Sequence, residues 1–210
     1  MSVTTLTARA QPARVSTRRA VDLLVVMLAA LVVVPVVAIL ALAIKLDSRG
    51  PVFWAHRRPG RDGRPFPVYK LRTMVEDADE MKASLNHLNV LPWPDFKIVD
   101  DPRVTRIGRF LRKTSLDELP QLYNVARGDM TLVGPRPCSI PVAHYETWQL
   151  ERLEATPGLF GLWQAAARGQ VDFAERCRMD IHQIRTRSFR NDTLLVFKTL
   201  VAVVRRHGGV

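Results

Sequence analysis

The feature that most constrains this chain is an unbroken apolar run from Leu23 to Ile44, which contains no charged side chain. A helix of this length rises about 1.5 Å per residue and is long enough to cross a hydrocarbon core of about 30 Å. A secretory signal peptide is the alternative, because basic residues precede the run and Ala41-Leu42-Ala43 resembles a cleavage site. Signal peptides have shorter apolar regions of about 7–15 residues, so the run favours a retained membrane helix.

Basic residues flank this run on both sides. Those before it are Arg9, Arg14, Arg18 and Arg19, and those after it include Lys45, Arg49, Arg57, Arg58, Arg61 and Arg64. Basic residues beside a membrane segment stay in the cytoplasm, so both flanks favour the same side. A helix that enters the bilayer, bends and returns satisfies both flanks, and Pro35 near its middle would provide the kink. Charge and proline alone leave a simple spanning helix open as the alternative.

The chain has 210 residues, enough for one domain with a sizeable core. We predict a disordered basic arm at residues 1–17, a membrane helix at 18–46 and a further domain at 47–210, which the basic flanks favour on the cytoplasmic side. The net charge of +11 favours anionic partners: nucleic acid, phosphorylated small molecules or the acidic cytoplasmic leaflet. The two cysteines, Cys138 and Cys177, have no spacing that suggests a metal site.

Short-range patterns predict several elements in the cytoplasmic domain. Two apolar stretches flank a Gly-Arg-Asp-Gly turn at residues 60–63, which predicts a β-hairpin. Thr73, with Glu76 three residues later, has the spacing of a capping box and predicts a helix start. Another helix is expected from Thr105, with an arginine stripe formed by Arg103, Arg106, Arg109 and Arg112. Asp192 is a candidate N-cap for a final helix that is too short to span a membrane.

Two adjacent carboxylates, Asp117 and Glu118, lie at a predicted helix start within the sequence KTSLDELPQLYN. Either Ser115 or Asp117 fits as the N-cap, and the second choice places Pro120 harmlessly in the first turn. In both cases the carboxylates stand beside free backbone N–H groups, which favour the ionised forms and also create an anion site. Taken alone, the pair is explained by helix capping.

The residues that follow suggest a phosphate site. Gly128 is expected to end the helix, and a Gly-Pro-Arg-Pro turn follows at residues 134–137. Pro135 and Pro137 restrict the backbone on both sides of Arg136, which suits an arginine that binds a phosphate. The segment at 157–169 adds an aromatic ring, an amide and another guanidinium, from Trp163, Gln164 and Arg168. Together these groups indicate a pocket for a nucleotide diphosphate.

Taken in order, these motifs resemble the bacterial sugar transferase family. The matching stretches are YKLRTM at 69–74, TRIGRFLRKTSLDELPQLYNV at 105–125, GDMTLVGPRP at 128–137 and PGLFGLWQ at 157–164. The family comprises small monotopic phosphoglycosyl transferases that begin the assembly of bacterial cell-surface glycans. The resemblance covers nearly everything from Arg19 onward.

The resemblance implies an α+β fold, predominantly helical, with an N-terminal re-entrant membrane helix, a small β-hairpin and amphipathic helices at the membrane interface. It implies transfer of a sugar 1-phosphate from a UDP-sugar to polyprenyl phosphate, with release of UMP and with Mg²⁺ as the cofactor. The expected partners are these two substrates and the bacterial inner membrane, with the catalytic domain on the cytoplasmic face. Nucleic acid is not an expected partner.

The resemblance also implies roles for individual residues. Asp117 would be the nucleophile that forms an acyl-phosphate intermediate, and Glu118 would bind Mg²⁺ with Asp117 and handle a proton of the lipid phosphate. This chemistry is sensible when metal and arginines neutralise the charge, because a carboxylate is otherwise a poor nucleophile towards an anionic diphosphate. The positions expected to bind substrate are Arg112, Arg136, Arg168, Lys70, Arg72, Pro135, Pro137 and Gln164.

The sequence departs from the family pattern at two places. Ala166-Ala167 precede Arg168 where the family has a small polar residue and Gly, which changes the φ preference of this loop. His182 stands where a Tyr is often found, and a surface or packing role is expected for it.

Two other functions stay open: a membrane-tethered basic protein that binds nucleic acid or acidic lipid, and a catalytically degenerate scaffold.

Overall fold

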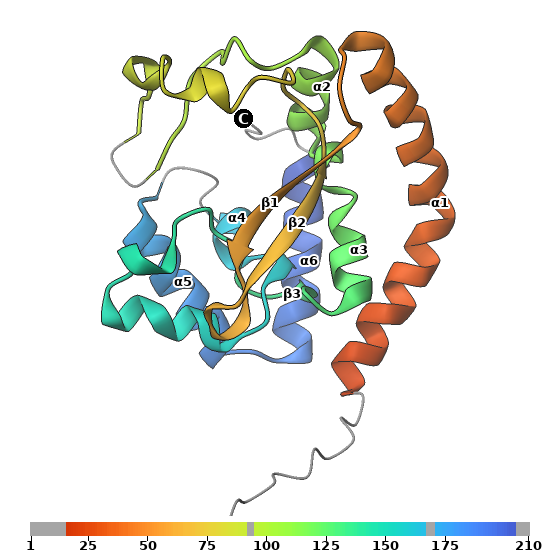
Figure 1. The fold of residues 1–210 in the computed structure, drawn as a ribbon. Helices are drawn as coiled ribbons and strands as arrows, with labels where there is room; N and C mark the ends of the chain where they lie inside the picture. The colour runs from red at the N-terminus through yellow and green to blue at the C-terminus, as the bar shows by residue number, and fades with distance from the viewer. Residues whose placement is uncertain (1–15, 92–94, 167–170, 205–210) are drawn as a thin grey trace, which may run out of the picture.

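The apolar run forms one continuous helix, α1 (Thr17–Asp47). The computed structural model describes residues 16–91, 95–166 and 171–204, so residues 1–15 of the predicted basic arm lie outside the described part. Pro35 lies inside α1, where it removes a backbone hydrogen bond, and the helix is bowed rather than straight (Figure 1). By length and composition, α1 is able to cross a membrane.

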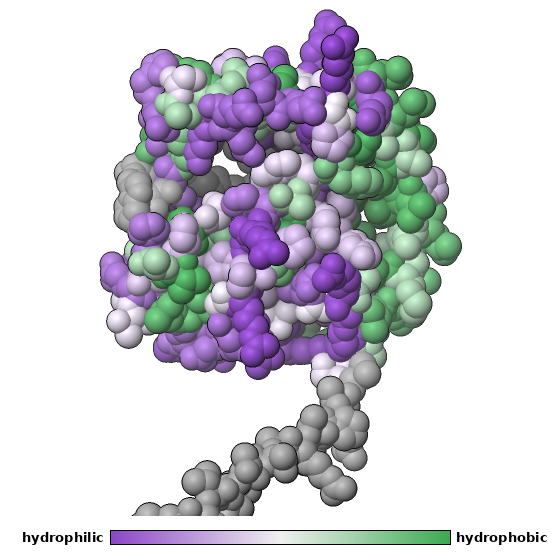
Figure 2. Space-filling model, in the orientation of Figure 1, coloured by the Kyte–Doolittle hydropathy of each residue, from purple (hydrophilic) through white to green (hydrophobic). Residues whose placement is uncertain are grey.

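The outer surface of α1 is apolar. Leu31 is 76% exposed, and Val32 and Ile39 are exposed to a similar extent. The edge formed by α1 is mostly hydrophobic, whereas the rest of the same face of the molecule is largely hydrophilic (Figure 2). A contiguous apolar surface of this kind is unfavourable in water, so α1 has the surface that a membrane segment requires.

Both ends of α1 are bonded to the same body. Near the first end, the buried Asp22 accepts hydrogen bonds from Thr131 Oγ1 at 2.6 Å and from the backbone N–H of Leu132 at 3.3 Å. At the other end, Asp47 Oδ2 accepts from the backbone N–H of Ile107 at 3.0 Å. This bond supplies a partner that a first-turn helix N–H otherwise lacks. The body on which α1 lies therefore holds the helix from both ends.

The predicted β-hairpin is confirmed. Strand β1 (Phe53–Pro59) pairs with β2 (Pro65–Leu71) in antiparallel register along the full length of both strands. In the turn, Asp62 and Gly63 have positive φ angles of 55° and 74°, which Gly adopts freely and Asp more readily than most residues. The turn predicted from Gly-Arg-Asp-Gly is therefore the one observed.

Helices and a second small sheet surround the hairpin (Figure 1). In chain order they are α2 (Arg106–Thr114), α3 (Gln121–Arg127), β3 (Thr131–Val133), β4 (Gly158–Phe160), α4 (Leu162–Ala166), α5 (Phe173–Arg185) and α6 (Phe189–Val204). Strands β3 and β4 are parallel, and the sequence did not predict this second sheet. The expected α+β class, mostly helical with a small hairpin, is confirmed.

Strand β2 and helix α1 both contribute to two parts of the core. The larger part contains Val26, Phe66, Val68, Val125, Met130, Leu132, Val133 and Leu195. The smaller part contains Ile44, Leu71 and Leu111, from α1, β2 and α2. Burying aliphatic and aromatic side chains contributes about 1.5–3 kcal/mol each, so these contacts fix β2 relative to α1 and α2. The position of Lys70, next to the buried Leu71, is fixed with them.

The helix predicted from Thr73 does not form. Met74 instead makes an antiparallel bridge with Val104, and the carbonyl of Thr73 accepts from the backbone N–H of Thr105 at 3.1 Å. These bonds to a distant segment take the place of the local capping box. The prediction was wrong because capping patterns count only partners a few residues away.

Thr105 caps α2 as predicted, with its hydroxyl accepting from the backbone N–H of Gly108. The arginine stripe does not form one face, since Arg106 and Arg109 are exposed whereas Arg103 is buried. The final helix, α6, begins before Asp192, so this residue lies in the first turn rather than at the cap.

Gly108 on α2 lies against the backbone of Thr73. A Cβ atom at this position would lie 2.0 Å from the Thr73 carbonyl oxygen, which is held by the adjacent bridge. We expect Gly108→Ala to lower the free energy of unfolding by about 1–3 kcal/mol, the range for overpacking, despite the higher helix propensity of alanine. Thermal unfolding in detergent measures this loss, with Arg109→Ala on the exposed side of α2 as the control. Equal unfolding temperatures for both variants would contradict the close contact.

Candidate active site

Asp117 and Glu118 lie in a short 3-10 turn, Leu116–Glu118, between α2 and α3. Ser115 precedes the turn with a φ of 59°, in the left-handed region, which ends α2 and redirects the chain. Neither Ser115 nor Asp117 caps α3, because that helix begins at Gln121. The helix-capping explanation of the pair is therefore wrong.

Lys70 and Arg136 are the partners of the two carboxylates. Lys70 Nζ, on β2, lies 3.1 Å from Asp117 Oδ2 and 2.9 Å from Glu118 Oε1. Arg136 donates from Nη1 to Glu118 Oε2 at 2.9 Å, and its Nη2 contacts Oε1 of the same carboxylate. A bidentate arginine fixes the orientation of a carboxylate. Asp117 Oδ1 takes no part in these bonds.

Charge in this network is strongly stabilised. Burial alone would raise the pKa of Glu118, but the charges and hydrogen bonds of Arg136 and Lys70 outweigh it and hold the pKa far below its ordinary range. Burial likewise opposes the charged form of Arg136, but Glu118 more than offsets this and raises the pKa of the guanidinium. Glu118 and Arg136 are therefore both ionised at neutral pH.

Two of the other arginines expected here, Arg112 and Arg72, lie within the described residues. Arg112 Nε donates to Thr73 Oγ1 at 2.9 Å. Burial lowers the pKa of Arg112, and the charge of Asp117 partly offsets this effect, so the two groups interact electrostatically. Arg72 is buried and donates from Nη2 to the carbonyl of Ser48 at 2.8 Å. Arg72 thus supports the loop after α1.

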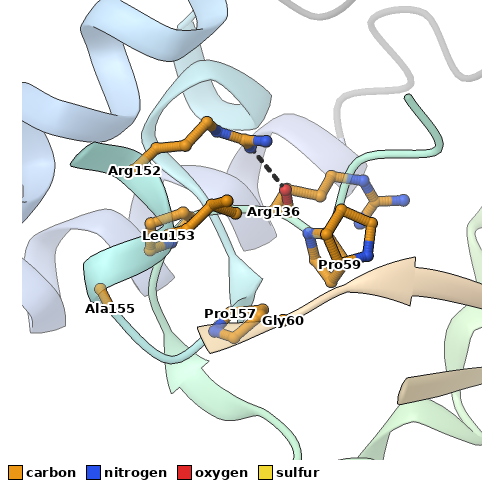
Figure 3. A pocket seen from close by; sticks show the side chains of 9 residues that line it. Pro59, Gly60, Arg136, Arg152, Leu153, Ala155 and Pro157 are labelled. Carbon is orange, nitrogen blue, oxygen red and sulfur yellow. Dashed lines mark hydrogen bonds between the residues drawn. The ribbon is translucent and has the colours of Figure 1, made fainter. Parts of the chain in front are cut away.

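The Pro-Arg-Pro turn is held through all three of its carbonyl groups. The bonds run from Gly158 N–H to Pro135 O at 2.8 Å, from Arg152 Nη2 to Arg136 O at 2.9 Å, and from Arg58 Nη1 to Pro137 O at 2.6 Å. Figure 3 shows the bond from Arg152 beside a cavity of about 10 Å³ behind the turn, which is no larger than one water needs. Tight packing and three hydrogen bonds therefore add to the rigidity that the prolines impose.

Sequence reasoning missed Arg58, Arg152 and Asp180. Arg152 is buried, and its Nε donates to Asp180 Oδ2 on α5 at 3.0 Å. Burial alone would lower the pKa of Arg152, but the carboxylate of Asp180 outweighs it and raises that pKa. The partners lie 28 residues apart, so no local pattern links them. The sequence offers one local signal for this ion pair: Asp180 stands between the apolar residues Met179 and Ile181 on α5.

Helix α4 begins beside the Pro-Arg-Pro turn. A Cβ atom on Gly161 would lie 3.4 Å from the backbone nitrogen of Arg136 in that turn. Gln164 Oε1 accepts a hydrogen bond from Gly161 N–H at 2.7 Å. Trp163 faces the guanidinium of Arg176, 5.6 Å from the ring centroid. Arg168 lies outside the described residues, and its role stays a prediction.

Asp117 and Glu118, which we call the dyad, can supply two carboxylates to a metal ion. Within the described ranges, no group of three or more His, Cys, Asp or Glu side chains is placed to share one. Mg²⁺ is commonly held by one or two carboxylates together with substrate phosphates and water, so Asp117 and Glu118 fit this ion. Asp117 Oδ1 is outside the ion-pair network, whereas both oxygens of Glu118 already accept bonds from Lys70 or Arg136, with which a metal would compete.

Cations exceed carboxylates at this site. Lys70 and Arg136 pair with the two carboxylates and Arg112 interacts electrostatically with Asp117, so the surroundings attract an additional anion. Cations placed around a phosphate stabilise the charge that develops when it is attacked. A carboxylate held among them is suited to act as a nucleophile towards phosphorus.

Comparison with known proteins identifies similar chains. The family model described as bacterial sugar transferase matches residues 13–206. The undecaprenyl-phosphate galactose phosphotransferase of Salmonella typhimurium is 44% identical over 164 residues, which cover 76% of this chain and 34% of that protein. The exopolysaccharide production protein ExoY of Sinorhizobium fredii is 38% identical over 196 residues, 91% of this chain and 87% of the relative. The UDP-glucose:undecaprenyl-phosphate glucose-1-phosphate transferase of Escherichia coli is 38% identical, over 87% of this chain and 39% of that protein.

Acid should weaken the folded state through Glu118. Its pKa lies below the ordinary value of 4.5, so its ion pairs stabilise the fold fully above about pH 4.5 and lose this effect as the pH falls through the folded pKa. We therefore expect Glu118→Gln to be less stable than the parent at neutral pH, and the difference to shrink between about pH 5 and pH 2.

Circular-dichroism melts across this pH range measure the difference. Glu80→Gln, at an exposed position, is the control and should show no such pH dependence. A deficit of Glu118→Gln that stays constant with pH would contradict the role of its ionised form.

Proposed function

The chain belongs to the bacterial sugar transferase family, and on this premise we propose that it is a phosphoglycosyl transferase. It transfers a sugar 1-phosphate from a UDP-sugar to polyprenyl phosphate, giving polyprenyl-diphosphate-sugar and UMP. Relatives named for undecaprenyl phosphate support this acceptor, and the exopolysaccharide relative supports a role in starting glycan assembly. The observation that carries the proposal is the carboxylate pair bound by Lys70 and Arg136, with Arg112 interacting electrostatically with Asp117.

In the first step, Asp117 attacks the phosphorus next to the sugar. A bond forms between the carboxylate oxygen and this phosphorus, the bond to the bridging oxygen breaks, and UMP leaves with that electron pair. In the second step, an oxygen of the lipid phosphate attacks the same phosphorus and releases the carboxylate. Asp117 Oδ1 is suited to the attack because it lies outside the bond with Lys70. The covalent intermediate divides one displacement into two.

The cations of the resting site are the groups that would receive the substrate phosphates. Arg136 is presented by a rigid turn, so little entropy is lost when it binds. As phosphates draw Arg136 and Lys70 away from Glu118, its carboxylate is released from these ion pairs and becomes available to bind Mg²⁺ or to accept a proton of the lipid phosphate.

Asp117 and Glu118 would hold Mg²⁺ together with phosphate oxygens and water. When bound, the ion neutralises charge on the diphosphate and so reduces repulsion of the attacking carboxylate. The chain's own contribution is to place two carboxylates on one short turn, with cations on both sides.

The anchoring of α1 supports a re-entrant membrane arrangement. Asp22 and Asp47, near its two ends, bond to the same body. A body on one side of the bilayer is compatible with a helix that enters, bends near Pro35 and returns. This re-entrant geometry keeps the basic flanks in the cytoplasm, as the distribution of charge favours. It also brings the site to a level where a lipid phosphate and a cytosolic UDP-sugar can meet.

Replacement of the nucleophile tests the reaction. With a UDP-sugar, polyprenyl phosphate and Mg²⁺, Asp117→Asn should lower UMP release by at least about 10³-fold, because an amide cannot form the intermediate. Asp62→Asn in the exposed hairpin turn is the matched control, since Asn tolerates the same backbone conformation. Acid-quenched samples with a labelled sugar phosphate should contain labelled protein for the control and none for Asp117→Asn. Parent-like turnover in Asp117→Asn excludes the covalent route.

Labelling of both flanks tests the membrane geometry. Thr17→Cys and Arg49→Cys, at exposed positions before and after the apolar segment, are made in a Cys138→Ser background, where Cys177 is buried. A membrane-impermeant maleimide should label both variants in inverted inner-membrane vesicles and neither in intact spheroplasts. Labelling of one flank in each preparation indicates a spanning helix and overturns the re-entrant arrangement.

A further inference from the structure

One face of the β-hairpin is directed at the candidate active site. Residues opposite each other in an antiparallel pair have their side chains on the same face, and the register places Trp54 opposite Lys70. Lys70 Nζ lies 3.1 Å and 2.9 Å from the two carboxylates of the dyad. Side chains alternate along a strand, so His56 and Arg58 share this face with Trp54. Arg58 donates to the carbonyl of Pro137. Trp54 and His56 therefore lie on the hairpin face that extends from the dyad to the Pro-Arg-Pro turn.

The rings of Trp54 and His56 form a parallel stack on this face. Their centroids lie 5.4 Å apart, and their planes differ by 3°. His56 covers part of the indole, yet Trp54 remains 38% exposed, so the stack is open to a further planar group. Nucleotide bases stack on aromatic side chains of this kind, because every base has a π face.

The stack is largely uncharged at neutral pH. Burial, and then the charge of Arg58, lower the pKa of the His56 imidazole below its ordinary value. Phosphate groups are therefore attracted to the cations around the dyad, whereas the stack suits a neutral planar group. A nucleotide diphosphate contains both parts, because its charged phosphates and its neutral base are joined through one ribose.

We propose that Trp54 binds the nucleobase of the donor substrate by stacking, with His56 supporting the indole. This assignment rests on the proposed function, because it takes the donor to be a UDP-sugar and places the uracil ring on Trp54. Since Trp54 and Lys70 are neighbours on one face, a base on the indole brings the attached diphosphate within reach of Lys70 and the dyad. Trp54 is thus a substrate-binding residue, and His56 is a positioning residue that acts through it.

Equilibrium binding separates contacts with the base from contacts with the phosphate. The full chain in detergent with Mg²⁺ is titrated with UMP, and separately with ribose 5-phosphate, which lacks the base, by isothermal titration calorimetry. Trp54→Ala removes the ring, and Trp54→Phe keeps a smaller one. Trp148→Ala is the matched control, because Trp148 lies outside the hairpin and is 37% exposed, as much as Trp54.

We expect Trp54→Ala to raise the Kd of UMP about tenfold, within the range for loss of one base stack, and to leave the Kd of ribose 5-phosphate unchanged. Trp54→Phe should recover most of the affinity for UMP, and Trp148→Ala should bind both ligands like the parent. In turnover assays, Trp54→Ala should raise the KM for the UDP-sugar while kcat changes little, because the dyad is intact.

Parent-like affinity of Trp54→Ala for UMP overturns the inference and leaves the proposed transfer reaction standing. A higher KM for the UDP-sugar at unchanged UMP affinity also overturns it, because the indole then contacts the sugar. Equal losses of UMP and ribose 5-phosphate binding do the same, since the change then acts on the phosphate site. If Trp54→Ala fails to fold, Trp54→Leu, which keeps apolar volume without a ring, takes its place with the same expected result. A parent chain that binds no UMP and forms no product from UDP-sugars overturns the proposed function itself.

Discussion

The ion pairs of Glu118 with Lys70 and Arg136 are the interaction on which the site depends. They join β2, the turn between α2 and α3, and the turn after β3. Strand β2 is positioned by two parts of the core. The turn that carries Asp117 and Glu118 is positioned by the left-handed Ser115, and the Pro-Arg-Pro turn by three hydrogen bonds to its carbonyl groups. A displacement of any of the three would separate charges that are buried together, which is costly.

The same cations have two tasks in the proposed reaction. In the resting site, Lys70 and Arg136 neutralise the carboxylates, and during the reaction they bind phosphates. A buried charge is stable only with a partner, so the substrate must provide anionic oxygens as the resting pairs separate. This exchange links phosphate binding to the release of Glu118 from its ion pairs. It also leaves neither Asp117 nor Glu118 without a cationic partner before substrate arrives.

Helix α1 is more than an anchor for the catalytic body. Its ends contribute Val26 and Ile44 to two parts of the core, and its middle exposes an apolar surface. Asp47 also satisfies an N–H in the first turn of α2, the helix that leads into the dyad. Helix α1 and the site are thus parts of one folded body.

The sequence by itself determined the elements that rest on local patterns. The apolar run gives α1, the Gly-Arg-Asp-Gly turn gives the hairpin, and Gly128 ends α3, while ordered motifs identify the family. Tertiary structure decided the rest. The capping box predicted at Thr73 is replaced by a bridge between Met74 and Val104. The residues that pair with the two carboxylates, Lys70 and Arg136, lie 18 to 48 residues away in the chain. Local patterns encode hydrogen bonds within a few residues, whereas ion pairs between distant segments exist only after the core has brought those segments together.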